Sequence, residues 1–304
     1  MPILVNWTSV AILSAITLAW VNVVDGHLLS KRLPGLRAFM LPLGIIHLIY
    51  GCLLFYLFPL PEGIGVWPIV VAVVSGILRT GAVTIMLYSL KSVEVSRVVP
   101  VVFTYPIIIA IIAVPLLGET LGYWQWLAII IVVTGAVMAS VRQGQFGTAI
   151  WLGKPFFLLF GSSLLFALTD ITSKYALAYI SFWNMFSVTA ICISGSFLLV
   201  SLRLQVLRQL SNLERRNQTL ALIVFNEALA PVGSVLSFWA LERGPVSLVS
   251  TILSSRPIFV VMFAFILSRI WPTFLEWQPG KGLLLLRLIA TVMIFGGIAI
   301  IYLS

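Results

Sequence analysis

Charged residues are scarce in this chain. They make up 9% of its 304 residues, whereas a soluble domain carries about 25%. This scarcity excludes a soluble enzyme of this size. Disordered proteins, fibrous proteins and coiled coils are excluded as well, because each needs more charge, a glycine repeat or a heptad pattern.

Cysteine is almost absent too, and catalytic motifs are missing. Cys52 and Cys192 both fall within apolar runs, which excludes a disulfide framework and makes both packing residues. The sequence has no metal-ligand spacing, no glycine-rich phosphate loop and no serine with a histidine and an acid in one loop. We therefore predict that the chain is not an enzyme and holds no metal or cofactor.

Apolar sequence is abundant, at 61% of the residues. It falls into ten segments, each near the roughly 20 residues that a membrane-spanning helix needs. The segments are Val5–Leu28, Ala38–Phe58, Val66–Leu90, Val95–Leu117, Tyr123–Val141, Pro155–Leu177, Phe182–Ser201, Thr219–Leu241, Val246–Ile270 and Gly282–Leu303. We predict an all-α integral membrane protein with ten transmembrane helices. The polar insert Leu202–Gln218 has leucines at helical spacing beside arginines, which predicts a short helix in the headgroup layer.

The two halves of the chain resemble each other. A shift of 151 positions places Val95-Ser96 on Val246-Ser247 and Pro106 on Pro257. Five spans in each repeat force the second repeat to enter the membrane in the opposite orientation, which creates a pseudo-two-fold axis in the membrane plane. We predict two inverted five-helix repeats, residues 1–142 and 155–304, joined by a linker at 143–154.

Several stretches of the sequence resemble a known family. They are Tyr88–Arg97, Tyr105-Pro106, Leu117–Glu119, Phe238–Ser247 and Arg256-Pro257. The chain is similar through them to the drug/metabolite transporter superfamily, in its EamA-like ten-helix branch. The resemblance implies a five-plus-five inverted repeat, a central cavity lined by both halves, and transport or export of small metabolites such as amino acids. The chain departs from the pattern at Arg269 and Ile270, which occupy the second-half positions equivalent to Gly118 and Glu119.

Basic residues are unevenly distributed among the loops. Of 15 basic residues near loops, 14 follow odd-numbered spans and only Arg243 follows an even-numbered one. We therefore interpret the basic residues behind the net charge of +9 as a signal of membrane orientation and not of nucleic-acid binding. The positive-inside rule predicts an inner- or plasma-membrane protein with the odd-numbered loops in the cytoplasm and both termini outside.

The first span carries a polar wall towards its end. The span ends with Trp20, Asp25 and His27, of which Asp25 lies on this wall. Ionisable side chains within a span are functional candidates because burying them in hydrocarbon is costly. The alternative is that Asp25 and His27 lie at the headgroup level. In the second span His47 stands alone, and we expect it to be packed against a backbone carbonyl.

Two arginines lie near the middle of their spans. Arg79 must face the bundle interior, either in a cavity or paired with Glu227. Arg256 directly precedes Pro257, as Tyr105 precedes Pro106. Each proline releases the carbonyl four residues earlier, so we predict helix kinks at both prolines.

The sixth span contributes a second set of ionisable groups. Asp170 and Lys174 are one helical turn apart, so they either pair with each other or take part in coupling. Asp170 matches His27 under a shift of 143, which would place a titratable group at the same depth in each half. Trp239 matches Tyr88 in the other half and is either a cavity wall or a residue of the interfacial aromatic belt.

These patterns favour a secondary transporter that works by alternating access. We predict that it moves a small organic metabolite, amino-acid-like or anionic, with proton coupling or exchange; a lipid flippase or scramblase, or a channel-like permease, is the alternative. The predicted substrate-binding residues are Trp20, Arg79, Tyr105, Trp239 and Arg256, and the candidates for coupling or charge relay are Asp25, His27, Asp170, Lys174 and Glu227. Small residues in the fifth and tenth spans favour close helix contact within a monomer, whose partners are a small-molecule substrate and the lipid bilayer.

Overall fold

The computed structural model describes residues 6–92, 102–140, 154–270 and 281–304, and every regular element in these ranges is a helix. In the first half these are α1 (Trp7–His27) with its π-helical continuation η1 (Leu28–Arg32), α2 (Leu36–Leu57), α3 (Val66–Ser92), α5 (Tyr105–Leu117) and α6 (Tyr123–Ser140). In the second half they are α7 (Lys154–Ala176), α8 (Phe182–Ser201), α9 (Leu204–Ser211), α10 (Arg216–Arg243), α11 (Val246–Leu253), α12 (Arg256–Ile270) and α13 (Lys281–Leu303).

Eight helical segments in the described ranges are long and apolar enough to cross a membrane. Two shorter apolar helices, Tyr105–Leu117 and Tyr123–Ala139, bring the apolar segments to the ten predicted from the sequence. The all-helical membrane fold is thereby confirmed. The predicted repeat boundary and the linker at 143–154 fall almost wholly on residues outside the described ranges, so the domain limits stay a prediction.

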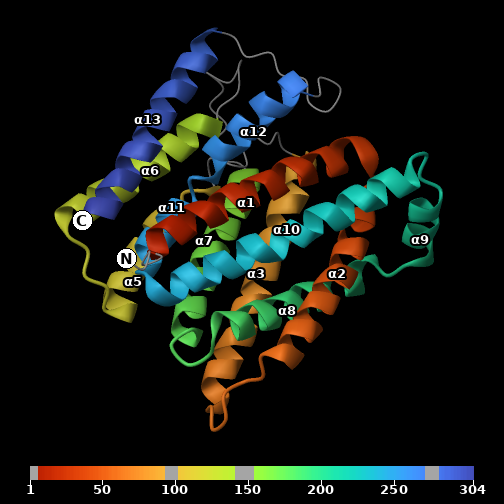
Figure 1. Ribbon diagram of the computed structural model, residues 1–304, viewed down its shortest axis with the longest axis horizontal. Helices are drawn as coiled ribbons and strands as arrows, with labels where there is room; N and C mark the ends of the chain where they lie inside the picture. Colours follow the sequence, from red (N-terminus) through yellow and green to blue (C-terminus); the bar gives the residue numbers. More distant parts are fainter. Residues whose placement is uncertain (1–5, 93–101, 141–153, 271–280) are drawn as a thin grey trace, which may run out of the picture.

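Helices from the two halves alternate throughout the bundle. α2 packs on α8 and α6 on α13, which are pairs of equivalent helices in the two repeats, and α5 packs on α11 of the other half. The contact of α3 with α7 is matched by that of α10 with α1, which lie side by side across the centre of Figure 1. These contacts agree with a two-fold exchange of the halves. The short helix α9, predicted within the polar insert, lies at the edge of the bundle.

Small residues and serine hydroxyls join the helices that cross between the halves. Ser14 of α1 donates to the carbonyl of Gly233 in α10 at 2.7 Å, and Ser194 of α8 donates to that of Gly44 in α2 at 2.7 Å. Hydrogen bonds across helices and close backbone approach replace the hydrophobic effect as the cohesive force within a bilayer. The polar residues at these interfaces therefore hold the bundle together and are not free for transport.

The span Val246–Ile270 is broken at its middle. α11 ends at Leu253, two serines form a turn, and α12 begins at Arg256 with Pro257 in its second position. Pro106 occupies the same second position at the start of α5. A proline suits the first turn of a helix, where its missing N–H has no intrahelical partner. The predicted kinks at these two prolines are thus corrected to helix starts.

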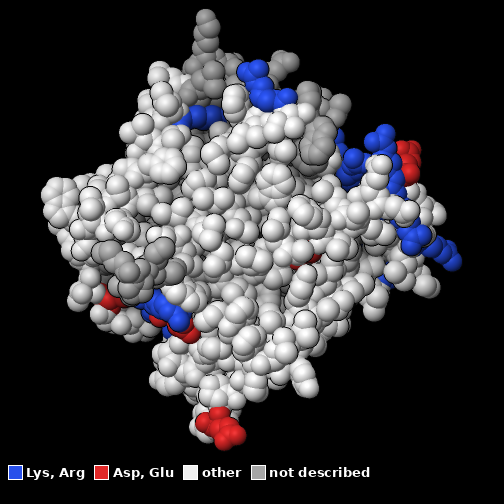
Figure 2. Space-filling view, viewed as in Figure 1, with Lys and Arg blue, Asp and Glu red and all other residues white. Residues whose placement is uncertain are grey.

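Charged side chains on the surface lie mostly near the ends of the bundle. Figure 2 shows basic side chains at the upper edge and at the right edge, where α9 lies in Figure 1, a smaller charged group at the lower left, and little charge across the middle. The start of α1 and the end of α13 lie at the left, away from that basic end. This separation of basic loops from both termini is the pattern that the positive-inside argument used.

Candidate functional site

A buried ion pair links the two halves near the centre of the bundle. Arg79 Nη2 of α3 donates to Asp170 Oδ1 of α7 at 3.3 Å, and the two side chains are 19% and 4% exposed. The Arg79 guanidinium also lies over the ring of Phe238 in α10, 5.0 Å from the ring centre. The alternative pairings of Arg79 with Glu227 and of Asp170 with Lys174 are therefore wrong.

Three polar groups from α11, α5 and α12 surround this pair. Ser250 Oγ donates to Asp170 Oδ2 at 2.7 Å, and the hydroxyl of Tyr105 donates to the Ser250 carbonyl at 3.4 Å. The charge of Arg256 acts on both Asp170 and Tyr105. Three of the predicted site residues, together with Asp170, thus converge from α3, α5, α7 and α12, and we call Arg79, Tyr105, Asp170, Ser250 and Arg256 the central cluster.

The central cluster carries more positive than negative charge. It holds two guanidinium groups and one carboxylate, and in the described part of the chain Asp170 is the carboxylate that acts on Arg256. Arg256 makes no hydrogen bond or ion pair there, and its Nε atom is buried without a partner, as is the Nε of Arg79. Because a charge away from water needs a counter-charge, this surplus of positive charge favours the binding of an anion at the central cluster.

A second polar cluster lies between α1, α2 and α10. Asn226 Nδ2 donates to Asp25 Oδ1 at 2.7 Å, and Glu227 Oε2 lies 3.7 Å from His47 Nδ1. That same nitrogen of His47 lies 2.9 Å from the carbonyl of Leu43, the backbone contact expected for it. We call Asp25, His47, Asn226 and Glu227 the acidic cluster. It has two carboxylates and no lysine or arginine bonded to them in the described ranges, so its charge balance is the reverse of the central cluster's.

The connection between α10 and α11 is held from two sides. Lys174 Nζ of α7 donates to the carbonyls of Leu241, Glu242 and Gly244, at 2.8, 3.2 and 2.8 Å. An ammonium has three N–H donors, so these bonds use all of them and leave none for a charge relay. From the other side, Glu119 accepts hydrogen bonds from the backbone N–H groups that open α11.

The remaining predicted residues lie elsewhere. Trp20 stacks edge-on against Phe263, 5.4 Å between ring centres. Trp239 lies beneath the guanidinium of Arg243 at 4.2 Å, near the end of α10, where an aromatic belt residue belongs. His27 accepts a hydrogen bond from Arg32 Nε at 3.4 Å, at the basic end of α1. None of these three interactions involves the central cluster.

Sequence reasoning missed three members of these sites. Ser250 and Asn226 carry no charge and stand among many serines and polar residues, so nothing marked them out. Glu119 was visible as half of a Gly-Glu pair absent from the second repeat, yet its function as a cap on α11 depends on a contact 127 positions along the chain.

Comparisons with known proteins agree with this architecture. A crystal structure, one of 27 matching chains, is 18% identical to this protein and superposes with a TM-score of 0.69, over 98% of this chain and 95% of its own. At that identity the likeness shows the fold alone. No curated protein matches the chain.

A family model adds the functional class. The model of the EamA-like transporter family matches residues 6–141. Members of this family are transporters and not enzymes, and together with the eight candidate spans the match indicates a multi-pass membrane transporter of small molecules. The match agrees with the resemblance drawn from the sequence, over residues 6–141.

Proposed function

We propose that the protein is an alternating-access secondary transporter for a small organic metabolite that carries a carboxylate or phosphate group, with the anion seated between Arg79 and Arg256. The observation that carries the proposal is the unpaired guanidinium of Arg256 beside an ion pair that already neutralises Arg79. A planar guanidinium binds carboxylate or phosphate through two parallel hydrogen bonds. An incoming anion of this kind would balance the charge of the central cluster.

The interrupted span supports the same location. α12 begins at Arg256, midway along Val246–Ile270. The N-terminal end of a helix carries a partial positive charge, and transporters commonly direct such half-helix ends at anionic groups of their substrates. The helix start and the guanidinium would then act on one anion.

The acidic cluster supplies the second half of the proposal. Asp25 of α1 and Glu227 of α10 belong to this one cluster, and neither has a lysine or arginine bonded to it in the described ranges. Two carboxylates buried in one cluster without such a cation hold a proton or receive a cation. We propose them as the coupling site or, for a zwitterionic substrate, as the seat of its ammonium group. We further propose the orientation with the basic odd-numbered loops in the cytoplasm and both termini outside.

A first experiment narrows the substrate class. Purified protein is screened for thermal stabilisation by amino acids, carboxylates and sugar phosphates, since a ligand that binds the folded state raises the melting temperature. The compounds that stabilise the protein are then tested for saturable uptake and counterflow in proteoliposomes.

Matched arginine variants test the site itself. Arg79→Gln and Arg256→Gln should abolish saturable uptake, whereas Arg243→Gln, at the end of α10 beside Glu242, should leave it intact. Normal transport by Arg256→Gln would remove this arginine from the site. Flux that neither saturates nor shows counterflow would replace the transporter with a channel or scramblase.

A further inference from the structure

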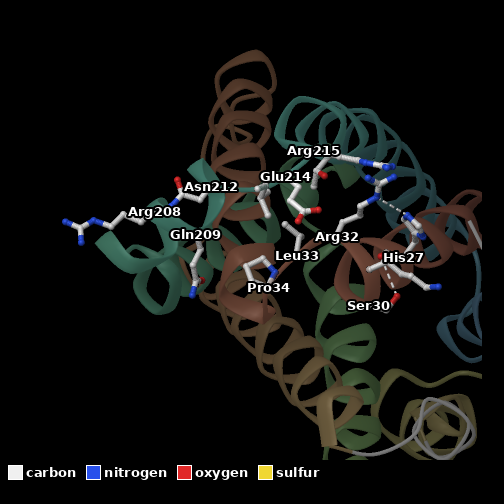
Figure 3. Close-up of a pocket in the computed structure, with 13 residues that line it drawn as sticks. His27, Ser30, Arg32, Leu33, Pro34, Arg208, Gln209, Asn212, Glu214 and Arg215 are labelled. Carbon is white, nitrogen blue, oxygen red and sulfur yellow. Dashed lines mark hydrogen bonds between the residues drawn. The ribbon is translucent and has the colours of Figure 1, made fainter.

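The basic end of the bundle contains a pocket unrelated to the central cluster. It has a volume of about 850 Å³ and lies between the turn η1, the helix α9 and the start of α10 (Figure 3). Its basic lining residues come from two segments far apart in the sequence: Lys31 and Arg32 from η1, and Arg208 and Arg215 from α9 and the loop that follows it.

Positive charge dominates this pocket. Four lysine and arginine side chains line it against one carboxylate, that of Glu214. In the described part of the chain none of the four forms an ion pair with a carboxylate. Figure 3 shows the side chains of Arg32 and Arg215 directed to the same end of the pocket, where Arg32 also donates to His27. Two guanidiniums that converge without a carboxylate between them favour a bound phosphate.

The residues around the pocket indicate at which depth of the lipid bilayer it lies. On one side of α9, Val206 is buried against Ala38 and Leu41 of α2. On another side Leu204 and Leu207 are 74% and 46% exposed, next to exposed arginines. A basic helix with an exposed apolar side, beside the ends of spanning helices, lies at the boundary between headgroups and acyl chains.

We propose that this pocket binds the phosphate group of an anionic phospholipid. Basic pockets between spanning helices at a membrane surface hold such headgroups, and each basic residue near the surface adds about 1 kcal/mol to the attraction. The phosphate sits between Arg32 and Arg215, and the acyl chains run along the exposed apolar side of α9. Because no residue of the central cluster lines the pocket, this site stands or falls independently of the transported substrate.

Lipid retention tests the site. The protein is purified in phosphatidylcholine nanodiscs doped with phosphatidylglycerol, and the lipids that remain bound are counted by native mass spectrometry. Wild type should retain one phosphatidylglycerol molecule in preference to phosphatidylcholine. Arg32→Gln and Arg215→Gln should each weaken this retention about tenfold, the equivalent of one charge-assisted hydrogen bond. Because Arg215 is exposed, its substitution leaves the fold intact even if that of Arg32 does not.

Arg216 provides a matched control. It follows Arg215 directly, is exposed like it and does not line the pocket, so Arg216→Gln should retain the lipid as wild type does. An equal loss in Arg216→Gln would show that diffuse surface charge attracts the lipid and would overturn the site. Unchanged retention in Arg215→Gln would do the same. If inorganic phosphate or glycerol phosphate raised the melting temperature while phosphatidylglycerol was not retained, a soluble phosphate and not a lipid would be the ligand.

Discussion

The central ion pair can be tested by removing its charges one at a time. At 3.3 Å between Arg79 Nη2 and Asp170 Oδ1, two unit charges attract by about 5 kcal/mol at an effective dielectric constant near 20. Breaking a buried pair by removing one partner typically costs about 3–5 kcal/mol, because the other charge stays buried alone. Asp170→Asn keeps the shape of the side chain and its contact with Ser250, yet leaves two buried guanidiniums facing each other.

We expect Asp170→Asn to lower the free energy of unfolding by about 3–5 kcal/mol. The double variant Asp170→Asn/Arg79→Gln should be less destabilised than the sum of the two single variants, by about 2 kcal/mol or more, because neither Arg79 nor Asp170 is then a buried charge that has lost its partner. Unfolding in mixed micelles of detergent and sodium dodecyl sulfate, followed by the fluorescence of the 10 tryptophans, measures all three variants.

A substitution of the uncharged residue that is hydrogen-bonded to Asp170 serves as the control. Ser250→Ala removes one uncharged donor to Asp170 and should cost about 1.5–3 kcal/mol, the value for one hydrogen bond to a charged group, and so less than the loss of the charge itself. If the effects of the Arg79 and Asp170 substitutions added within about 0.5 kcal/mol, the two residues would not be coupled, and the charge balance assigned to the central cluster would be wrong.

Further predictions concern the anion seat and the helix contacts. Arg256→Lys should keep part of the uptake that Arg256→Gln loses, because an ammonium keeps the charge but not the planar pair of donors; initial rates in proteoliposomes compare the two. Glu119→Gln should lower the free energy of unfolding by about 1–2 kcal/mol by weakening the cap on α11, and Lys174→Met should lower it by about 2 kcal/mol by freeing three carbonyls. A Cβ at Gly135 would lie 2.8 Å from a side-chain carbon of α13 and 3.0 Å from one of its carbonyl oxygens, so Gly135→Ala should cost about 1–3 kcal/mol. Gly296→Ala, with open space around it, should not. Melting curves in detergent measure these four variants.

Much of the fold follows from the sequence because burial in a membrane leaves a strong local signal. The ten apolar segments, the helix in the polar insert and the special positions of Pro106 and Pro257 are all visible in short windows of residues. Both prolines stand at helix starts in the structure because proline fits the first turn of a helix, where its missing N–H has no intrahelical partner. The sequence pattern alone does not distinguish such a start from a bend within one helix.

Partners across helices were harder to predict. Spacing along one helix suggested Asp170 with Lys174, but Lys174 stands in the last turn of α7. Its long side chain extends towards the end of the bundle and reaches the α10 carbonyls instead. Arg79 and Glu227 lie on facing repeats, and only the packing of α2 beside α10 shows that Glu227 turns to His47. The spacing of residues along one helix does not indicate which side chain of another helix a charged residue contacts.

The hydrogen bonds that Lys174 and Glu119 make to the connection between α10 and α11 have a consequence for the free energy of transport. Glu119 and Lys174 secure that connection, and the 151-residue shift places Ile270 where Glu119 would recur. An isoleucine side chain cannot accept a hydrogen bond, so the shift supplies no second carboxylate at the position that corresponds to Glu119. In the alternating cycle proposed above, the two ends of the protein would open in turn, and opening the end that holds this connection would require breaking the hydrogen bonds of Glu119 and Lys174. An empty carrier of this kind would then rest with that end closed, and substrate binding would offset the free energy of opening it.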